Sequence, residues 1–407
     1  MGSLKSLFAP TDMTVGPPWK KIIAFAIPML IGNIAQQLYN TVDSIVVGRY
    51  VGDNALAAVG SAGPILNLLL VLFVGISVGA SIMVSQYFGA KEREELSSTI
   101  GCCITLTAIS SVIIMVLAPM LIRPLLHLLN TPESIIEWCD SYLTILFVGI
   151  AGMAFYNILS GILRGLGDSV SALIYLLVST VLNIILDVWF VAGLSMEVAG
   201  VALATAIAQG VSAVLCLLRL SRMKEIFDLK PRYLKPGKRH SLMIVKLGLP
   251  SGLTQAIFSM AMIVVQSLTN SFGEMVIAAN VIIMRVDGFA MMPNFSFGTA
   301  MTTYAGQNVG ANNYKRVDDG AKQGTLIAVA VSTVITALIL IFGKYLMGVF
   351  TETAELVQLS NHMMHILAAG YIAMAVTQCL SGMMRGAGDT MTPMWISLIT
   401  TVALRVP

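Results

Sequence analysis

Residues 159–168 read LSGILRGLGD, and residues 380–389 read LSGMMRGAGD. The two stretches lie 221 residues apart, and further pairs of residues keep this offset: Ala57-Ala58 with Ala278-Ala279, Gln86 with Gln307, and Gly89-Ala90 with Gly310-Ala311. Because separate stretches share one offset without a gap, chance is a poor explanation. The chain therefore contains an internal repeat that relates its two halves.

The composition places the chain in a membrane. Hydrophobic residues make up 57% of it and charged residues 11%, whereas about 25% of the residues of a soluble domain are charged. The apolar runs reach about 20 residues or more, which is the length needed to cross a bilayer. We therefore expect a polytopic membrane protein surrounded by lipid. Two fused apolar halves with a site between them are typical of secondary transporters.

Eleven apolar segments predict an all-α fold. The second half holds five of them, and its copy of the repeat stops at Pro407, inside its fifth helix. The repeat therefore predicts two six-helix lobes and a natural chain that continues for about 35–50 residues to complete a twelfth helix. We expect an N-terminal lobe at 1–220, a basic linker at 221–241 and a C-terminal lobe at 242–407. The segments span 20–47, 55–86, 97–126, 136–163, 170–193, 197–220, 242–270, 275–306, 319–349, 353–384 and 390–407.

The basic residues predict the orientation. With the N-terminus in the cytoplasm, nineteen of the 24 lysines and arginines fall on the cytoplasmic side, nine of them in the segment 219–246. This is the distribution that the positive-inside rule requires. The basic linker is interpreted as a connector beside anionic lipid, and we expect no nucleic acid to bind. The five exceptions are Arg49, Arg123, Lys344, Arg285 and Arg405.

Three acidic residues lie deep in the predicted helices: Asp43, Asp187 and Asp287. A carboxylate inside a membrane is costly, so these residues are candidates for function. Asp287 follows Arg285 closely, and it either pairs locally or faces a polar cavity. Asp43 and Asp187 both belong to the first half, which favours that half as the place of a cation site.

Polar neighbours strengthen the case for Asp43 and Asp187. Asn183 lies four residues before Asp187 and so on the same helix face, while Gln36, Asn40 and Asp43 recur at helical spacing. Such a stripe must line a bundle interior or a water-filled cavity. Two carboxylates and an amide form a hard oxygen set that suits a proton or a small alkali cation. The alternative is that both acids are structural and only hydrogen-bond neighbouring helices.

Other motifs are less specific or missing. The turns that hold Arg164 with Asp168 and Arg385 with Asp389 are interpreted as turn and gate-stabilising motifs. The Gly-x4-Gly-Lys-Ser/Thr phosphate loop is absent, which argues against ATP hydrolysis by this chain. The sequence has four histidines, which is unfavourable for an integral membrane enzyme. We expect neither an enzyme nor a cofactor beyond a coupling ion.

These motifs together resemble the multidrug and toxin extrusion (MATE) family of cation-coupled antiporters. The resemblance rests on residues 28–60, on 86–90, on the repeated Arg-Gly-x-Gly-Asp turn and on NIILDVWF from Asn183. It is strongest to the bacterial branch of the DNA-damage-inducible type. It implies twelve helices in two lobes that form a V, and export of small organic cations driven by inward proton or sodium flow. We expect a monomer in the bacterial cytoplasmic membrane.

The resemblance also implies roles for residues. The coupling proton or sodium ion would bind Asp43, Asn183 and Asp187, with Thr205 beside them. Some members carry a glutamate early in the seventh helix, where this chain has Gln255. This departure disfavours a sodium site in the C-terminal lobe. The predicted substrate cavity comprises Gln36, Tyr39, Asn40, Asn157, Ser160, Gln255 and Asp287.

A second interpretation remains open, namely a flippase of the same superfamily that moves a lipid-linked precursor. Such a protein would need a cavity lined by several basic residues that bind phosphate. The deep helix interiors offer Arg285 and Arg405, which favours the antiporter.

Overall fold

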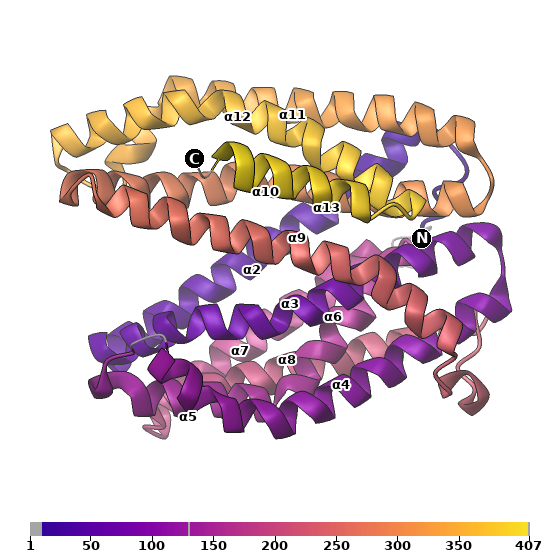
Figure 1. Ribbon diagram of the computed structural model, residues 1–407, viewed down its shortest axis with the longest axis horizontal. Coiled ribbons are helices and arrows are strands. Elements are labelled where there is room, and N and C mark those ends of the chain that lie inside the picture. Colours follow the sequence, from indigo (N-terminus) through magenta and orange to yellow (C-terminus); the bar gives the residue numbers. More distant parts are fainter. Residues whose placement is uncertain (1–9, 129–130, 406–407) are drawn as a thin grey trace, which may run out of the picture.

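The computed structural model describes residues 10–128 and 131–405, and these residues form a bundle of long helices (Figure 1). Nine helices in the described ranges are long and apolar enough to cross a membrane, and a bent helix pair makes a tenth span. All eleven predicted segments are helical over their described residues, so the all-α fold is confirmed; residues 406–407 of the last segment lie outside those described. In the first half the helices are α2 (Pro18–Tyr50), α3 (Asp53–Ala90), α4 (Arg93–Leu128), α5 (Glu133–Val148), α6 (Ile150–Gly165), α7 (Ser169–Asp187), the π-helix η1 (Val188–Gly193) and α8 (Glu197–Ser221).

The second half follows the same order after a short 3₁₀ turn. It contains η2 (Pro231–Leu234), α9 (Lys238–Asn270), α10 (Glu274–Gly310), α11 (Tyr314–Gly348), α12 (Ala354–Ala387), α13 (Met391–Leu398) and the π-helix η3 (Ile399–Arg405). One segment differs from prediction, because the span expected at 136–163 is broken. It bends by 53° between α5 and α6. The break falls at Gly149, where an added Cβ would lie 2.6 Å from the Cβ of Ala206 in α8.

The first helix of each half crosses from one lobe to the other (Figure 1). At the start of α2, Ile22 and Phe25 pack with Met301 and Tyr304 of α10, whereas its second half joins the helices of the first half. In the same way the start of α9 places Ile244 in the core of the first half. The lobes therefore interlock at α2 and α9, and each lobe includes a few turns of the other half's sequence.

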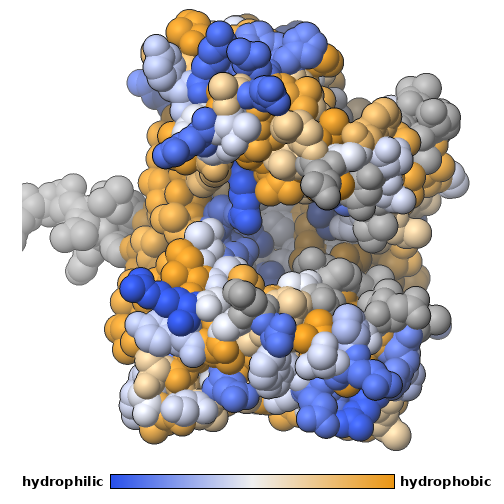
Figure 2. Space-filling view, turned by 90° about the vertical axis from the view of Figure 1, so that its left-hand side faces the viewer, coloured by the Kyte–Doolittle hydropathy of each residue, from blue (hydrophilic) through white to orange (hydrophobic). Residues whose placement is uncertain are grey.

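The lobes meet on the face where α2 and α9 begin, which we call the N-terminal face. Figure 2 looks onto the opposite face and shows it hollowed between the two lobes, with hydrophilic side chains inside the hollow. The helices of the two lobes thus converge at one face and spread toward the other.

Two reciprocal contacts close the N-terminal face. The Gln86 side chain donates to the Gly386 carbonyl at 2.9 Å, and its repeat mate Gln307 donates to the Gly165 carbonyl at 3.2 Å. Between these bonds α3 crosses α10 so closely that a Cβ on Gly89 would lie 1.9 Å from the Gln307 carbonyl oxygen. A Cβ on Gly310 would meet the Gln86 carbonyl at the same distance. Only glycine permits this crossing on either side.

The segment before α2 adds to this closure. The Thr11 amide donates to the Gly167 carbonyl of the first half at 3.2 Å. The Met13 amide donates to Gln307 Oε1 of the second half at 2.8 Å, and its carbonyl accepts from Arg316 at 3.0 Å. The chain from Thr11 to Met13 therefore bridges both lobes at the N-terminal face.

The repeat is also visible in the backbone. Gly167 and Gly388 have φ of +85° and +99°, a left-handed conformation that glycine adopts without a steric penalty. In the next residue Asp168 accepts from the Ser171 amide, and its mate Asp389 accepts from Thr392, both at 3.0 Å. Asp168 is the N-cap of α7, a position that favours aspartate, while Asp389 makes the equivalent bond one residue before the N-cap of α13. The interpretation as a turn motif therefore agrees with the geometry.

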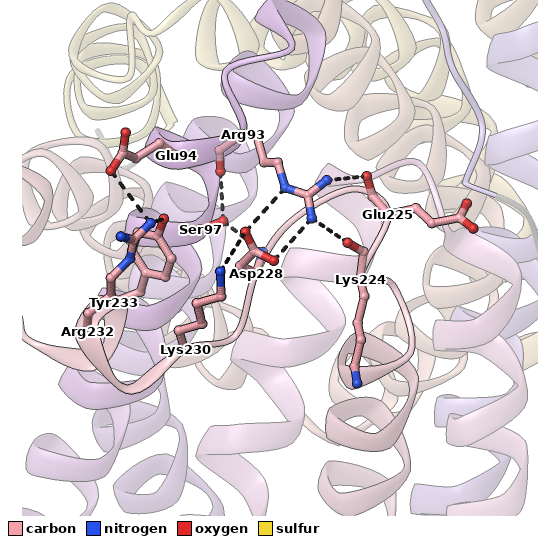
Figure 3. A network of polar contacts seen from close by, with 9 residues as sticks. All are labelled: Arg93, Glu94, Ser97, Lys224, Glu225, Asp228, Lys230, Arg232 and Tyr233. Carbon is pink, nitrogen blue, oxygen red and sulfur yellow. Dashed lines mark hydrogen bonds and ion pairs between the residues drawn. The ribbon is translucent and has the colours of Figure 1, made fainter.

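The linker is fixed to the N-terminal end of α4 (Figure 3). Arg93 pairs with Asp228 at 3.1 Å and donates to the Glu225 carbonyl at 2.8 Å. The hydrogen bond from Arg93 lowers the pKa of the Asp228 carboxyl below its usual value. The Asp228 amide donates to Ser97 Oγ at 2.9 Å. The basic linker is thus an ordered strap on the first half.

We predict that the double substitution Gly89→Ala and Gly310→Ala opens the N-terminal face, because each methyl group would overlap a backbone carbonyl of the other lobe. Spin labels at Tyr50 and Phe272, which are exposed at the opposite face, would report this as a population with a shorter distance. Gly370→Ala is the matched control, since a Cβ there meets nothing within 4 Å. An unchanged distance distribution in the double variant would contradict the role of this crossing.

Candidate cation site and interlobe cavity

Two aspartates from different helices converge inside the first half. Asp43 lies in α2, and Asp187 ends α7 one turn after Asn183. Asn183 and Asp187 are fully buried. The Asn183 amide is oriented with its nitrogen toward the carboxylates, because the opposite orientation would set its oxygen against two acceptors. The nitrogen then donates to Asp43 Oδ1 at 2.9 Å and to Asp187 Oδ2 at 3.1 Å.

Two hydroxyl groups complete this cluster. The Tyr39 hydroxyl donates to Thr205 Oγ1 at 3.0 Å, and Thr205 Oγ1 lies 3.4 Å from the side-chain amide of Asn183. Tyr39 was predicted to line the substrate cavity, but it is buried here because it lies one turn before Asp43 on the same face of α2. We call Tyr39, Asp43, Asn183, Asp187 and Thr205 the acid site.

The acid site has spare capacity for a cation. Asp187 Oδ1 is buried without a hydrogen-bond donor among the described residues, and so is Gln209 Oε1, one turn after Thr205 in α8. An ionised oxygen without a partner is unfavourable in the interior of a membrane protein. A proton or a small cation on Asp187 would relieve that cost, and the neighbouring ligands are hard oxygens.

The polar stripe of α2 continues away from the acid site. Gln36 donates to Asn40 Oδ1 at 3.4 Å, and Asn40 is exposed. Nearer the N-terminal face, Asn33 donates to Ser296 of α10 at 3.0 Å. The stripe therefore joins the acid site to the contact between the lobes.

A separate cavity of about 450 Å³ lies between the lobes, with a wall drawn from α2, α3, α6, α9, α10, α12 and α13. Gln255, one of the residues predicted for a substrate cavity, lies in this wall beside hydroxyl and apolar side chains. The charged side chains in the described lining are Arg164 and Arg385, and none of the described lining residues is acidic.

Six other residues predicted for a substrate cavity are not among the described lining residues of this cavity. Asn157 donates to the Met153 carbonyl at 2.8 Å, and Ser160 donates to the Asn157 carbonyl at 3.0 Å while 1% exposed, so both polar groups are satisfied within α6. Asp287 accepts a hydrogen bond from Tyr371 of α12 inside the second half. The six residues are Gln36, Tyr39, Asn40, Asn157, Ser160 and Asp287.

Two arginines line the cavity that were not predicted to do so from the sequence. Arg164 was expected to act in its turn with Asp168, but Asp168 pairs instead with Arg219 of α8 at 2.9 Å. Arg164 and Arg385 face the cavity. The signal that could have found them is the repeat, because it predicts that equivalent residues of the two halves lie around one central axis.

The fold and these two polar regions define a secondary transporter, in which two repeated helical lobes enclose a cavity and one lobe buries a carboxylate site. The sequence model of the MatE family matches residues 28–189 and 250–407. The chain therefore belongs to the MatE family, which confirms the resemblance seen in the sequence. It is an integral membrane transporter.

Individual relatives match over nearly the whole chain. YpnP of Bacillus subtilis (strain 168), a probable multidrug resistance protein, is 31% identical over 396 residues, covering 97% of this chain and 88% of the relative. YoeA of the same organism is 29% identical over 96% of this chain and 86% of the relative. A structure described as the outward-facing conformation of a multidrug resistance MATE family transporter superposes with a TM-score of 0.91, at 26% identity over 98% of this chain and 89% of that chain.

We predict that Thr205→Val destabilises the protein, because it removes the acceptor of the Tyr39 hydroxyl and leaves that group buried without a partner. Hydrogen bonds between membrane helices contribute about 0.6 kcal/mol on average and up to about 1.7 kcal/mol, so a loss of about 1 kcal/mol is expected in reversible denaturation. Thr333→Val is the control, since that exposed hydroxyl donates to the Val329 carbonyl of its own helix and to no other group among the described residues. Equal losses in both variants would contradict the network.

Proposed function

We propose that this chain exports small organic cations across the bacterial cytoplasmic membrane in exchange for protons or sodium ions. The observation that carries the proposal is the Asn183 amide, which bridges Asp43 of α2 and Asp187 of α7 at hydrogen-bond distance. The names of the relatives YpnP and YoeA, both probable multidrug resistance proteins, support export of drug-like compounds.

The coupling step follows from two carboxylates that share one amide in a buried site. Two like charges this close are unfavourable in a low dielectric, so a proton or a sodium ion binds there readily. Binding neutralises the repulsion between α2 and α7 and lets α2 pack closer to α7. Loss of the ion has the reverse effect.

The helix α2 transmits this change to the interface between the lobes. Its second half carries Asp43, whereas its first half packs Ile22 and Phe25 against α10 of the other lobe. Pro28 lies between the two parts, and a proline inside a helix allows it to bend there. The coupling ion and the drug favour different arrangements of α2. Binding of either one therefore shifts the equilibrium between the two arrangements and changes the affinity for the other.

The N-terminal face is proposed to be cytoplasmic, because the predicted positive-inside orientation puts the basic linker and the Arg-Gly turns there. The closed N-terminal face and the hollow on the opposite face then correspond to an outward-open state. In this state drug would leave toward the outside and the coupling ion would enter the acid site.

We predict that Asp187→Asn reduces coupled export of a fluorescent organic cation at least tenfold in proteoliposomes, because the variant keeps the shape of the carboxyl group but cannot take up the coupling charge. Asp318→Asn serves as the control, since Asp318 is exposed and pairs with Lys322 one turn away.

A proton gradient and a sodium gradient are imposed in separate experiments. The gradient that drives export of the fluorescent cation identifies the coupling ion. Export by Asp187→Asn at the rate of the unmodified protein, with equal amounts of folded protein in the vesicles, would refute the acid site as the coupling site.

A further inference from the structure

We propose that the cavity between the lobes binds a phosphate-bearing ligand between Arg164 and Arg385. The two arginines are equivalent residues of the repeat, and they enter the same cavity from α6 of one lobe and α12 of the other. Arg164 directly precedes Gly165, whose carbonyl accepts from Gln307. Arg385 directly precedes Gly386, whose carbonyl accepts from Gln86. The pair therefore lies at the closed end of the cavity, next to the N-terminal face.

Neither arginine has an ion-pair or hydrogen-bond partner among the described residues. Other arginines of the same region are satisfied: Arg219 pairs with Asp168 at 2.9 Å, and Arg316 donates to Asn308 Oδ1 at 3.1 Å. Both arginines are partly exposed to the cavity, and a guanidinium at membrane depth without a counter-charge is unfavourable. Both arginines therefore offer positive charge to the same cavity, and an anion bound there would supply the missing counter-charge.

The rest of the lining supplies donors and no competing anion. Ser381 lies one turn before Arg385 in α12, and the Ser81 backbone of α3 packs against Gly165, the residue after Arg164. No hydrogen bond engages either serine hydroxyl among the described residues. Gln378 adds an amide one turn before Ser381. Because no described lining residue is acidic, a cationic ligand would find no counter-charge in the described wall of this cavity.

A phosphate group matches this donor set better than a carboxylate. Each guanidinium offers five N–H donors in a planar fork that suits phosphate oxygens, and two forks from opposite lobes need an acceptor with oxygens on more than one side. The cavity volume of about 450 Å³ exceeds that of a single ion, and Met29, Phe258 and Phe295 give it an apolar part. A phosphate-bearing amphiphile would satisfy both parts, with its phosphate on the arginines.

This site is distinct from the acid site, whose members are not among the described residues of the cavity lining. The inference goes beyond the proposed export of cations and does not rest on it. A bound phosphate would neutralise the arginines and remove the repulsion that a cationic drug meets in the empty cavity. The same ligand would also tie the two lobes together at their closed end.

Binding to the purified protein tests the inference without any ion gradient. Affinities for dihexanoyl phosphatidic acid and for inorganic phosphate are measured by calorimetry in a neutral detergent, with the unmodified protein and with Arg164→Gln and Arg385→Gln. We expect each substitution to weaken binding at least tenfold. Arg285→Gln is the matched control, because this exposed arginine of α10 is not among the described lining residues.

The outcomes separate the possible sources of the phosphate. Binding of phosphatidic acid but not of inorganic phosphate identifies a lipid headgroup as the ligand, and similar binding of both identifies a free phosphate group. Arg164→Lys and Arg385→Lys keep the charge, so they should retain more affinity than the glutamine variants at equal thermal stability. Absence of binding by either probe, or equal affinity in all variants, would overturn the proposal while leaving the acid site untouched.

Discussion

The reciprocal crossing of α3 and α10 is the constraint on which the arrangement of the lobes depends. Gly89 lies against the Gln307 carbonyl and Gly310 against the Gln86 carbonyl, while both glutamine side chains reach the Arg-Gly turn of the other lobe. The contact consists of backbone and hydrogen bonds rather than of large side chains. Such an interface either fits closely or separates, which favours two discrete arrangements of the lobes over a continuous range.

The helix α2 connects the carboxylate of Asp43 with the contact between the lobes. A single helix carries the Asp43 carboxylate in one lobe and packs Phe25 into the other, so a change in the acid site cannot remain within one lobe. On the far side of the site, α7 turns into the π-helix η1 directly after Asp187. Irregular turns of this kind are frequent at functional sites, and here the irregularity borders the carboxylate that lacks a donor.

The sequence predicted the features that follow from the chemistry of single residues and short segments. Apolar length identified the helices, and the cost of a carboxylate in lipid identified Asp43 and Asp187. It did not predict the break at Gly149 or the place of Tyr39, because both depend on how closely another helix approaches. The position of Arg164 in the cavity wall was also not predicted, since its nearest acid in the sequence, Asp168, pairs with Arg219 of a different helix.

The two polar regions carry opposite charge, and this separation constrains the transport cycle. The acid site contains two carboxylates, Asp43 and Asp187, inside one lobe. The cavity between the lobes is lined by one arginine from each lobe. Under the two proposals, a cation at Asp187 acts through α2, which packs in both lobes. An anion held by Arg164 and Arg385 would have to release at least one arginine when the lobes separate at the N-terminal face. On these proposals, charge in the cavity would affect how easily the lobes separate, while charge in the acid site would act on the position of α2.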